Sequence, residues 1–552
     1  MFRQKVMKIF QPRIFNSVKE QGKKQIINDI VAGIIVAIIA LPLSIALAIA
    51  SGVSPEKGLY TAIVAGFVIS FLGGSSVNIS GPTAAFATIV AGIVATYGIN
   101  GLVIATIMAG IILIIMGLLK LGSLIKYIPY TISTGFTSGI ALTILIGQIK
   151  DFLGLTFPHG AAPVETMEKA AEVVKSIGTL NPMALLVGLI SLGILIVWPK
   201  INKKIPGSLI AVIVGVLIVK LFNMPVNTIG DLYTISASAP TFQLPEISLG
   251  MVKELIPSAF TIALLAGIES LLSCVVSDSM TGDRHNSNTE LIAQGVGNIC
   301  SGLFGGIPAT GAIARTAANV KNGGRTPIAG IVHAIVLLLI LVVLMPYAAW
   351  IPMPVIAAVL FMVAYNMCEW RQFVEICKTA PKSDIIVLVL TFVLTVAFDL
   401  VVAIEIGMLA ATILFMKRMS DVTRIRTWTT ADEMTEEDAG RLKQIPKRTA
   451  VFEIDGPMFF ATSDKVASIP IKSGIKVMII RMRNIPALDA SAMRAMWAMY
   501  EVCKEQEITL LLSHANEQPM QVMEKAGFVD AVGKDNFLSN IDEALIKAEE
   551  LN

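Results

Sequence analysis

Two ionisable residues, Glu269 and Arg315, lie in stretches of the chain that are otherwise rich in apolar and small residues. Charged groups inside a membrane segment are costly and are usually retained for function. Ser273 follows Glu269 by four residues and so shares its helical face. The Glu269 carboxylate could take up and release a proton, or form a hard-oxygen sodium site with Ser273 and nearby carbonyls. A structural hydrogen bond between helices is the third reading.

Arg315 belongs to one of two stretches that interrupt apolar runs. Residues 78–87 read Asn-Ile-Ser-Gly-Pro-Thr-Ala-Ala-Phe-Ala, and residues 305–316 read Gly-Gly-Ile-Pro-Ala-Thr-Gly-Ala-Ile-Ala-Arg-Thr. In each, a proline opens a run of small residues, and proline suits the first position of a helix. A helix that begins inside a membrane points free N–H groups and a positive dipole end at a ligand, usually an anion.

Paired interrupted segments in two halves of a chain point to a transporter site. Glycine and proline also kink and pack membrane helices, which is the alternative explanation of both stretches. Arg315 would add positive charge to an anion site, or would pair with Glu269 in a salt bridge.

The composition is that of a polytopic membrane protein. Of 552 residues, 55% are hydrophobic and 15% are charged, and the mean hydropathy is +0.74. The net charge of +3 gives no reason to expect a nucleic-acid partner. The five cysteines lack CxxC spacing, and P-loop, HExxH and Ser/His/Asp patterns are absent from the sequence. We therefore expect no metal, no cofactor and no enzyme activity.

The hydropathy pattern predicts an α-helical polytopic protein with about fourteen segments in the region 29–416. Lys and Arg concentrate in alternate loops, which places the N- and C-termini in the cytoplasm. The predicted segments are 30–50, 58–72, 77–95, 102–119, 128–149, 181–198 and 205–221, then 256–277, 290–304, 309–320, 326–345, 351–367, 383–399 and 401–416.

Two sequence markers indicate an internal repeat. Pro308 follows Pro82 by 226 residues, and Trp350-Ile351-Pro352 follows the similar Tyr127-Ile128-Pro129 by 223. Two halves of seven segments, at about 29–221 and 256–416, must be inverted relative to each other because seven is odd.

The two ends of the chain have a different composition. Residues 1–28 form a basic cytoplasmic arm, and residues 417–447 form a charged linker. From 448 to 552, strand-like runs (449–454, 475–481, 508–512) alternate with helical runs (491–507, 518–526, 540–549). This pattern predicts a small cytoplasmic α/β domain.

Several motifs resemble the SulP family of anion permeases, the bacterial and plant sulfate transporters related to animal pendrin and prestin. They are residues 40–46, Ala-Leu-Pro-Leu-Ser-Ile-Ala; 58–62, Gly-Leu-Tyr-Thr-Ala; 80–84, Ser-Gly-Pro-Thr-Ala; 267–271, Gly-Ile-Glu-Ser-Leu; and 283–288, Asp-Arg-His-Asn-Ser-Asn, leading into 305–316. The C-terminal part resembles the STAS domain that SulP proteins carry. The resemblance covers nearly the whole chain.

The resemblance implies a core domain that moves against a gate domain, and a homodimer. It places the anion between the third and tenth segments, at residues that correspond to Thr83, Ala84, Ala85, Thr310, Gly311, Ala312 and Arg315. Glu269 occupies the family's acidic position, where sodium-coupled relatives carry an aspartate together with a hydroxyl residue near Ile313. Glutamate and isoleucine here favour proton coupling or no cation.

The resemblance also suggests a regulatory site in the STAS domain. In related anti-sigma-factor antagonists, a Ser or Thr two places after an Asp can be phosphorylated, which matches Asp489 and Ser491, although Ala492 follows where glycine is common. The STAS domain could bind a cytoplasmic regulator.

The sequence thus predicts secondary active transport of an inorganic anion, with sulfate expected, across the cytoplasmic membrane by alternating access. Glu269 and Ser273 are the candidate cation-coupling residues, and proton coupling through Glu269 is favoured over sodium. Bicarbonate or C4-dicarboxylate transport, an anion channel and a membrane-anchored signalling protein are the alternatives.

Overall fold

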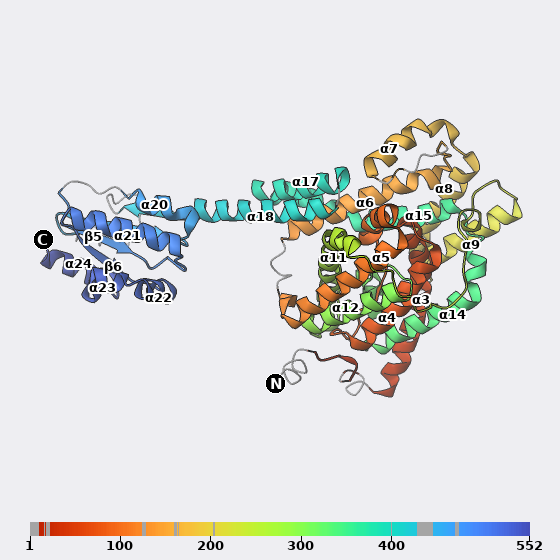
Figure 1. The fold of residues 1–552 in the computed structure, drawn as a ribbon, viewed down its shortest axis with the longest axis horizontal. Helices are drawn as coiled ribbons and strands as arrows, with labels where there is room; N and C mark the ends of the chain where they lie inside the picture. The colour runs from red at the N-terminus through yellow and green to blue at the C-terminus, as the bar shows by residue number, and fades with distance from the viewer. Residues whose placement is uncertain are drawn as a thin grey trace. The chain divides into compact units, whose positions relative to one another are not determined.

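The structure of the chain is a computed structural model. It describes residues 10–15, 17, 22–123, 129–158, 163, 165–202, 205–398, 400–427, 445–469 and 474–552. The repeat marker at Tyr127 and Ile128, half of the expected N-terminal arm and residues 428–444 of the expected linker lie outside the described residues. The chain forms two compact units, Met1–Met408 and Leu409–Asn552, which are described separately (Figure 1).

The first unit is mainly helical, and every predicted apolar segment overlaps a described helix, although 77–83 and 309–312 are not helical. Eight helical stretches within the described ranges are long and apolar enough to span a membrane. The helices are α3 (Lys23–Ala50), α4 (Pro55–Leu72), α5 (Ala87–Leu118), α6 (Tyr130–Leu153), α8 (Pro182–Ile201), α9 (Gly207–Leu221), α11 (Leu249–Thr281), α12 (Ser287–Leu303), α13 (Ile313–Lys321), α14 (Ile328–Ala348), α15 (Met353–Cys368) and α17 (Lys382–Ala397). Helix α18 (Leu400–Val422) begins in the first unit and continues into the second.

Two predicted segments, 77–95 and 102–119, join without a loop. Helix α5 runs through both, and its single non-helical residue is Gly98, with φ 68° and ψ −171°. Glycine adopts this conformation without the steric cost that a β-carbon would add. The hydropathy pattern did not predict three helices, because each is too short or too polar to form an apolar run. They are α7 (Thr166–Lys175), α10 (Ile229–Leu232) and α16 (Trp370–Thr379).

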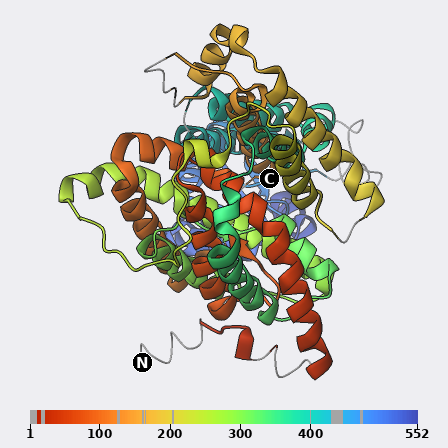
Figure 2. The same ribbon diagram turned by 90° about the vertical axis from the view of Figure 1, so that its right-hand side faces the viewer.

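The helices of the first unit pack in two groups. In the core group, α5 packs on α11 and α12, and α14 packs on α3 and α4, as Figure 2 shows for the red helix α3. In the gate group, α6 packs on α15, α16 and α17, and α8 packs on α9 and α15. The groups meet where α3 contacts α15 and α9.

The two interrupted stretches lie side by side in the core group. Strand β1 (Ser80–Gly81) pairs antiparallel with β2 (Thr310–Gly311), with Ser80 opposite Gly311 and Gly81 opposite Thr310. Short helix η1 (Ala84–Phe86) follows β1 and leads into α5, and α13 follows β2. Because the strands are antiparallel, the chain passes through the two stretches in opposite directions, as inverted halves require.

The prediction that the prolines open the half-helices is wrong. Thr83 is the N-cap of η1, and Ala312 is the N-cap of α13, so each proline lies in the extended part. Strand pairing across β1 and β2 holds the chain extended there, and a proline also disfavours helical geometry at the residue before it.

Side chains from neighbouring helices satisfy the extended backbone. Asn298 of α12 accepts from the Ala309 N–H at 2.8 Å and donates to the Ala309 carbonyl at 2.9 Å. Thr61 Oγ1 of α4 accepts from the Ile307 N–H at 2.7 Å. Non-helical backbone at membrane depth is stable only with such partners.

The second unit is a small α/β domain. Its sheet has the order β3-β4-β5-β6-β7, with β3 antiparallel to β4 and the other neighbours parallel. The strands are β3 (Arg424–Thr427), β4 (Thr449–Asp455), β5 (Val477–Arg481), β6 (Thr509–Ser513) and β7 (Phe537–Leu538), and the helices are α20 (Ser463–Ala467), α21 (Ala490–Glu505), α22 (Glu517–Lys525), α23 (Phe528–Val532) and α24 (Ile541–Glu550). Strand β3 comes from the segment expected as a linker.

Both faces of this sheet are covered. Alternate residues of β5 point to opposite sides, as in any strand. Met478 and Ile480 pack in the cluster that includes Met496 of α21, and Val477 and Ile479 pack in the cluster that includes Leu545 of α24. The continuous apolar run of β5 therefore indicates a strand buried on both faces.

Candidate functional site

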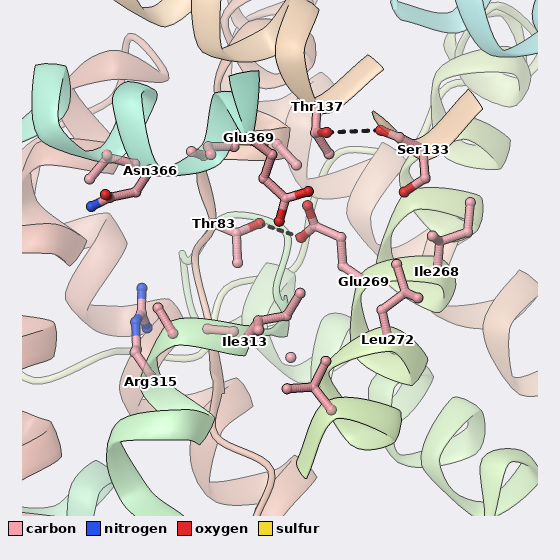
Figure 3. Close-up of a pocket in the computed structure, with 18 of the residues that line it drawn as sticks. Thr83, Ser133, Thr137, Ile268, Glu269, Leu272, Ile313, Arg315, Asn366 and Glu369 are labelled. Carbon is pink, nitrogen blue, oxygen red and sulfur yellow. Dashed lines mark hydrogen bonds between the residues drawn. The ribbon is translucent and has the colours of Figure 1, made fainter. Parts of the chain in front are cut away.

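A cavity of about 1120 Å³ opens where the two half-helices begin (Figure 3). The core group contributes the ends of η1 and α13 and one face of α11, and the gate group contributes α6, α15 and the start of α16. The labelled lining residues in Figure 3 are Thr83, Ser133, Thr137, Ile268, Glu269, Leu272, Ile313, Arg315, Asn366 and Glu369.

The structure brings most of the predicted site residues to this cavity. The residues that line it are Thr83, Ala84, Ala85, Glu269, Gly311, Ala312 and Arg315. They come from three stretches that are far apart in the sequence, so the β1–β2 pair and α11 together assemble the site. Thr310 and Ser273 do not line it.

Thr83 joins the first half-helix to α11. Its hydroxyl donates to Glu269 Oε2 at 2.9 Å. A carboxylate accepts this bond readily, and the bond fixes the Glu269 side chain beside the start of η1. The side chain that could carry a proton is therefore in direct contact with a residue at an expected anion-binding position.

Arg315 joins the second half-helix to the first interrupted stretch. The side chain is 3% exposed, and its Nη2 donates to the Pro82 carbonyl at 2.5 Å. A Cβ at Gly81 would lie only 2.5 Å from Arg315 Nη1, so the glycine makes room for the guanidinium. Arg315 and Glu269 have different hydrogen-bonding partners, and a salt bridge between them does not occur among the described residues.

The structure places Ser273 away from the cavity lining. Its hydroxyl, which is fully buried, donates to Asn78 Oδ1 at 2.8 Å and contacts Thr316 Oγ1 at 3.0 Å. The spacing of four residues does place Ser273 near Glu269 along α11. This face of α11 is wide, however, so Glu269 lines the cavity while Ser273 hydrogen-bonds to Asn78 in the segment before β1.

Thr310 is likewise a supporting residue. Its hydroxyl, which is fully buried, donates to the Ala266 carbonyl at 3.0 Å and lies 2.8 Å from Ser270 Oγ. Ser270 Oγ also accepts from the Gly311 N–H at 2.9 Å. These bonds attach β2 to α11, so Thr310 positions the second half-helix without facing the cavity.

Sequence reasoning missed Glu290, a carboxylate with no exposed surface. It accepts from the N–H groups of Gly74 at 2.9 Å and Ser75 at 3.2 Å, and from Asn78 Nδ2 at 2.8 Å. A glutamate in the first turn of a helix is normally explained by its favourable interaction with the helix dipole. The sequence therefore did not indicate that Glu290 accepts hydrogen bonds from a distant loop. Glu290 instead fixes the loop that leads into β1.

The loop between α11 and α12 contains a Ser-His-Asp contact that the sequence spacing did not reveal. His285 Nδ1 lies 2.7 Å from Asp278 Oδ2, and its Nε2 lies 3.0 Å from Ser287 Oγ. Asp278 Oδ2 also accepts from the His285 N–H at 3.1 Å. The three side chains close the loop at the end of α11.

In the second unit, Asp489 and Ser491 lie at the start of α21. Asp489 caps the helix, since it accepts from the Ala492 N–H at 2.8 Å and from the Phe460 N–H at 2.9 Å. Ser491 is exposed. Phosphorylation of Ser491 stays a prediction. Among the described residues, no cluster of three His, Cys, Asp or Glu side chains could hold a metal ion.

Comparison with known proteins gives consistent results over both units. The sequence model of the Sulfate permease family matches residues 26–391, and that of the STAS domain matches residues 441–544. The chain is 40% identical over 502 residues to "Putative sulfate transporter YvdB" of Bacillus subtilis, which covers 89% of this chain and 92% of the relative. It is 32% identical over 517 residues to "Bicarbonate transporter BicA" of a Picosynechococcus strain, which covers 90% of each chain.

Two solved structures share the fold. The murine Solute Carrier 26 family member A9 anion transporter, in the inward-facing state, matches with a TM-score of 0.89 at 19% identity, over 100% of this chain and 95% of that one. The transmembrane domain of a cyanobacterial BicA matches with a TM-score of 0.63 at 31% identity, over 71% of this chain and 98% of that one. The chain described here belongs to the sulfate permease family and carries a STAS domain.

Proposed function

We propose that this chain is a secondary active transporter of a small inorganic anion, with sulfate as the expected substrate. The observation that carries the proposal is the convergence of two half-helix N-termini and the buried Arg315 on one cavity. Relatives named as sulfate transporters support sulfate. The 32% identical relative named a bicarbonate transporter makes bicarbonate the second candidate, and a C4-dicarboxylate is the third.

Charge at the site fits a dianion when Glu269 is protonated. Each helix N-terminus contributes about half a positive charge, so two of them with Arg315 present about two positive charges to the cavity. An ionised Glu269 would reduce this to about one, which suits a monoanion. Binding of sulfate would therefore favour protonation of Glu269, and this linkage is the basis of proton symport.

Proton coupling agrees better than sodium coupling with the side chains near Glu269. Its hydrogen-bonding partner is the Thr83 hydroxyl, whereas Ser273 is engaged with Asn78. The aliphatic Ile313 lines the cavity and supplies no oxygen ligand. A sodium ion needs about six oxygen ligands, as hard cations generally do.

Alternating access would follow from movement of the core group against the gate group, because the cavity lies between them. The distribution of Lys and Arg supports a cytoplasmic-membrane protein with both termini in the cytoplasm. We further propose a homodimer, and a STAS domain that binds a cytoplasmic regulator, on the family resemblance alone. A chain that uses its membrane part in this way is not expected to be an enzyme.

Uptake of labelled sulfate into proteoliposomes with an inward proton gradient tests the proposal. Proton-dependent accumulation that bicarbonate, succinate and chloride fail to inhibit would support sulfate symport. Accumulation of bicarbonate or succinate without sulfate would replace the substrate. Rapid flux without accumulation against a gradient would indicate a channel. A folded protein that moved none of these anions would contradict the proposal in favour of a signalling protein.

A further inference from the structure

Glu369 connects α15 to α16 in a backbone conformation that is unfavourable for a glutamate. Its φ of 43° and ψ of 38° lie in the left-handed region. Glycine usually occupies this position at a helix end because a β-carbon is disfavoured there. Such strain persists where the surrounding structure and the use of the side chain require it.

Helix α6 contacts the chain on both sides of Glu369, at the Cys368 backbone and at the Gln372 side chain. Ser138 Oγ donates to the Cys368 carbonyl at 2.6 Å, and the Tyr130 hydroxyl donates to the Gln372 side chain. The Glu369 carbonyl accepts from the Gln372 N–H at 2.8 Å. The Glu369 carboxylate does not cap α16, although it stands at the N-cap position. The turn is therefore fixed by other groups, and the carboxylate is left to line the cavity.

The Glu369 carboxylate points into the cavity from the gate group, whereas Glu269 and Arg315 belong to the core group (Figure 3). Glu369 is exposed, whereas Glu269 is only partly accessible. The ionisable residues that line the cavity are Tyr130, Glu269, His285, Arg315 and Glu369. The other ionisable residues of α16 are Arg371, Glu375, Cys377 and Lys378, and they do not line it.

These groups make a poor anion site when every one is in its usual charge state. Arg315 contributes one positive charge, and the two carboxylates contribute one negative charge each. Together with about one positive charge from the two helix N-termini, the sum is about zero, so a dianion that entered would find no net positive charge. Addition of a proton to each carboxylate raises the sum to about two positive charges, so the anion and the protons each strengthen binding of the other.

We propose that Glu369 is a second proton-binding carboxyl group of the transport cycle, acting from the gate wall of the cavity opposite Glu269. This inference rests on the proposed anion transport. A hydronium ion in the water of the cavity transfers its proton to the ionised Glu369 carboxylate, which becomes a neutral carboxylic acid while the anion is bound. The proton returns to water when the anion leaves on the other side.

Labelled sulfate uptake and proton uptake, followed with a pH dye enclosed in proteoliposomes, test this role in the full-length protein. Glu369→Gln should lower the number of protons carried per sulfate by about one. Glu369→Asp keeps a carboxyl group and should retain most of the wild-type ratio. Glu375→Gln is the matched control, because it removes the same charge from α16 at an exposed position that does not line the cavity. An unchanged proton-to-sulfate ratio in Glu369→Gln would overturn the proposal.

Two further measurements separate this inference from folding effects and from the proposed function. Glu369→Gly relieves the left-handed strain, so it should unfold at a higher temperature than wild type and still show the reduced proton ratio. If a Glu369 variant does not transport, proton release or uptake on addition of sulfate to the detergent-solubilised protein gives the same comparison. Wild-type sulfate symport with an unchanged Glu369→Gln ratio would contradict the role of Glu369 alone. A wild-type protein that moved no anion would contradict both proposals.

Discussion

Gly81→Ala should displace the guanidinium of Arg315 without unfolding the protein. The new Cβ would lie 2.5 Å from Arg315 Nη1 and 3.5 Å from Ala62 Cα. The second distance is an ordinary van der Waals contact, so the backbone of α4 tolerates the methyl group. The first is far too short, and Arg315 Nη1 is the end of a long side chain that can move.

The size of the effect follows from the hydrogen bond on the other side of the guanidinium. Nη1 must retreat by about 0.9 Å to reach ordinary contact near 3.4 Å. The guanidinium is planar and rigid, so Nη2 moves with it and its 2.5 Å bond to the Pro82 carbonyl is strained or lost. A hydrogen bond from a charged donor contributes about 1.5–3 kcal/mol, which corresponds to a loss of about ten- to hundredfold in anion affinity.

Sulfate uptake in proteoliposomes gives the concentration at half-maximal rate, and thermal unfolding in detergent gives the stability. Gly92→Ala is the control, because no atom lies within 4 Å of the Cβ that it adds to α5. We expect Gly81→Ala to raise the half-maximal sulfate concentration by about ten- to hundredfold in a folded protein whose melting temperature is modestly below wild type, because the strained Arg315–Pro82 bond also stabilises the fold. A folded Gly81→Ala protein with wild-type sulfate dependence would refute the assignment of Arg315 to the anion site.

Three other substitutions and one chemical-labelling experiment test separate parts of the structure. Arg315→Ala should abolish or strongly weaken anion binding, measured by equilibrium binding of labelled sulfate; unchanged affinity would remove Arg315 from the site. Glu269→Gln should make uptake independent of the pH gradient, and retained proton-driven accumulation would assign coupling elsewhere. Asn298→Ala leaves the buried N–H and carbonyl of Ala309 without these partners, so it should destabilise the helical unit by about 2–4 kcal/mol and lower its melting temperature; a melting temperature equal to wild type would contradict the role of this amide. Burial raises the pKa of the Cys503 thiol to about 11, so about a thousandth is thiolate at pH 8 and the protonated thiol should resist iodoacetamide until the domain unfolds; peptide mapping that finds rapid modification of native Cys503 would contradict this burial.

The membrane segments and the C-terminal domain followed directly from local sequence patterns. A membrane helix needs about twenty mainly apolar residues, so runs such as 30–50 and 326–345 can be recognised as membrane helices from the sequence. In the C-terminal domain, β5 could be predicted at 475–481 because a short apolar run in a polar sequence indicates a buried strand. Both signals lie within one element and need no distant partner.

Glu269 and Arg315 were singled out as site candidates because of the free-energy cost of placing an ionisable group in an apolar segment. An ionisable side chain in an apolar run, such as Glu269 or Arg315, must be stabilised by something, and that requirement is visible in the sequence. The partner is not visible. The contact of Glu269 with Thr83 and that of Arg315 with Pro82 join residues 186 and 233 positions apart.

The direction of each side chain was decided only by the tertiary structure. Helical spacing places Ser273 on the same broad face as Glu269, but the packing of α11 against the segment before β1 turns the Ser273 hydroxyl toward Asn78. In the same way Glu290 and Asn298, which read as ordinary polar residues of a helix, complete the hydrogen bonds of extended backbone elsewhere in the chain. Hydrophobic burial depends mainly on composition along the chain, whereas a buried polar group needs a partner at one distance and angle. The sequence by itself therefore determined which segments are apolar and which residues are costly, and only the three-dimensional packing determined which of them meet.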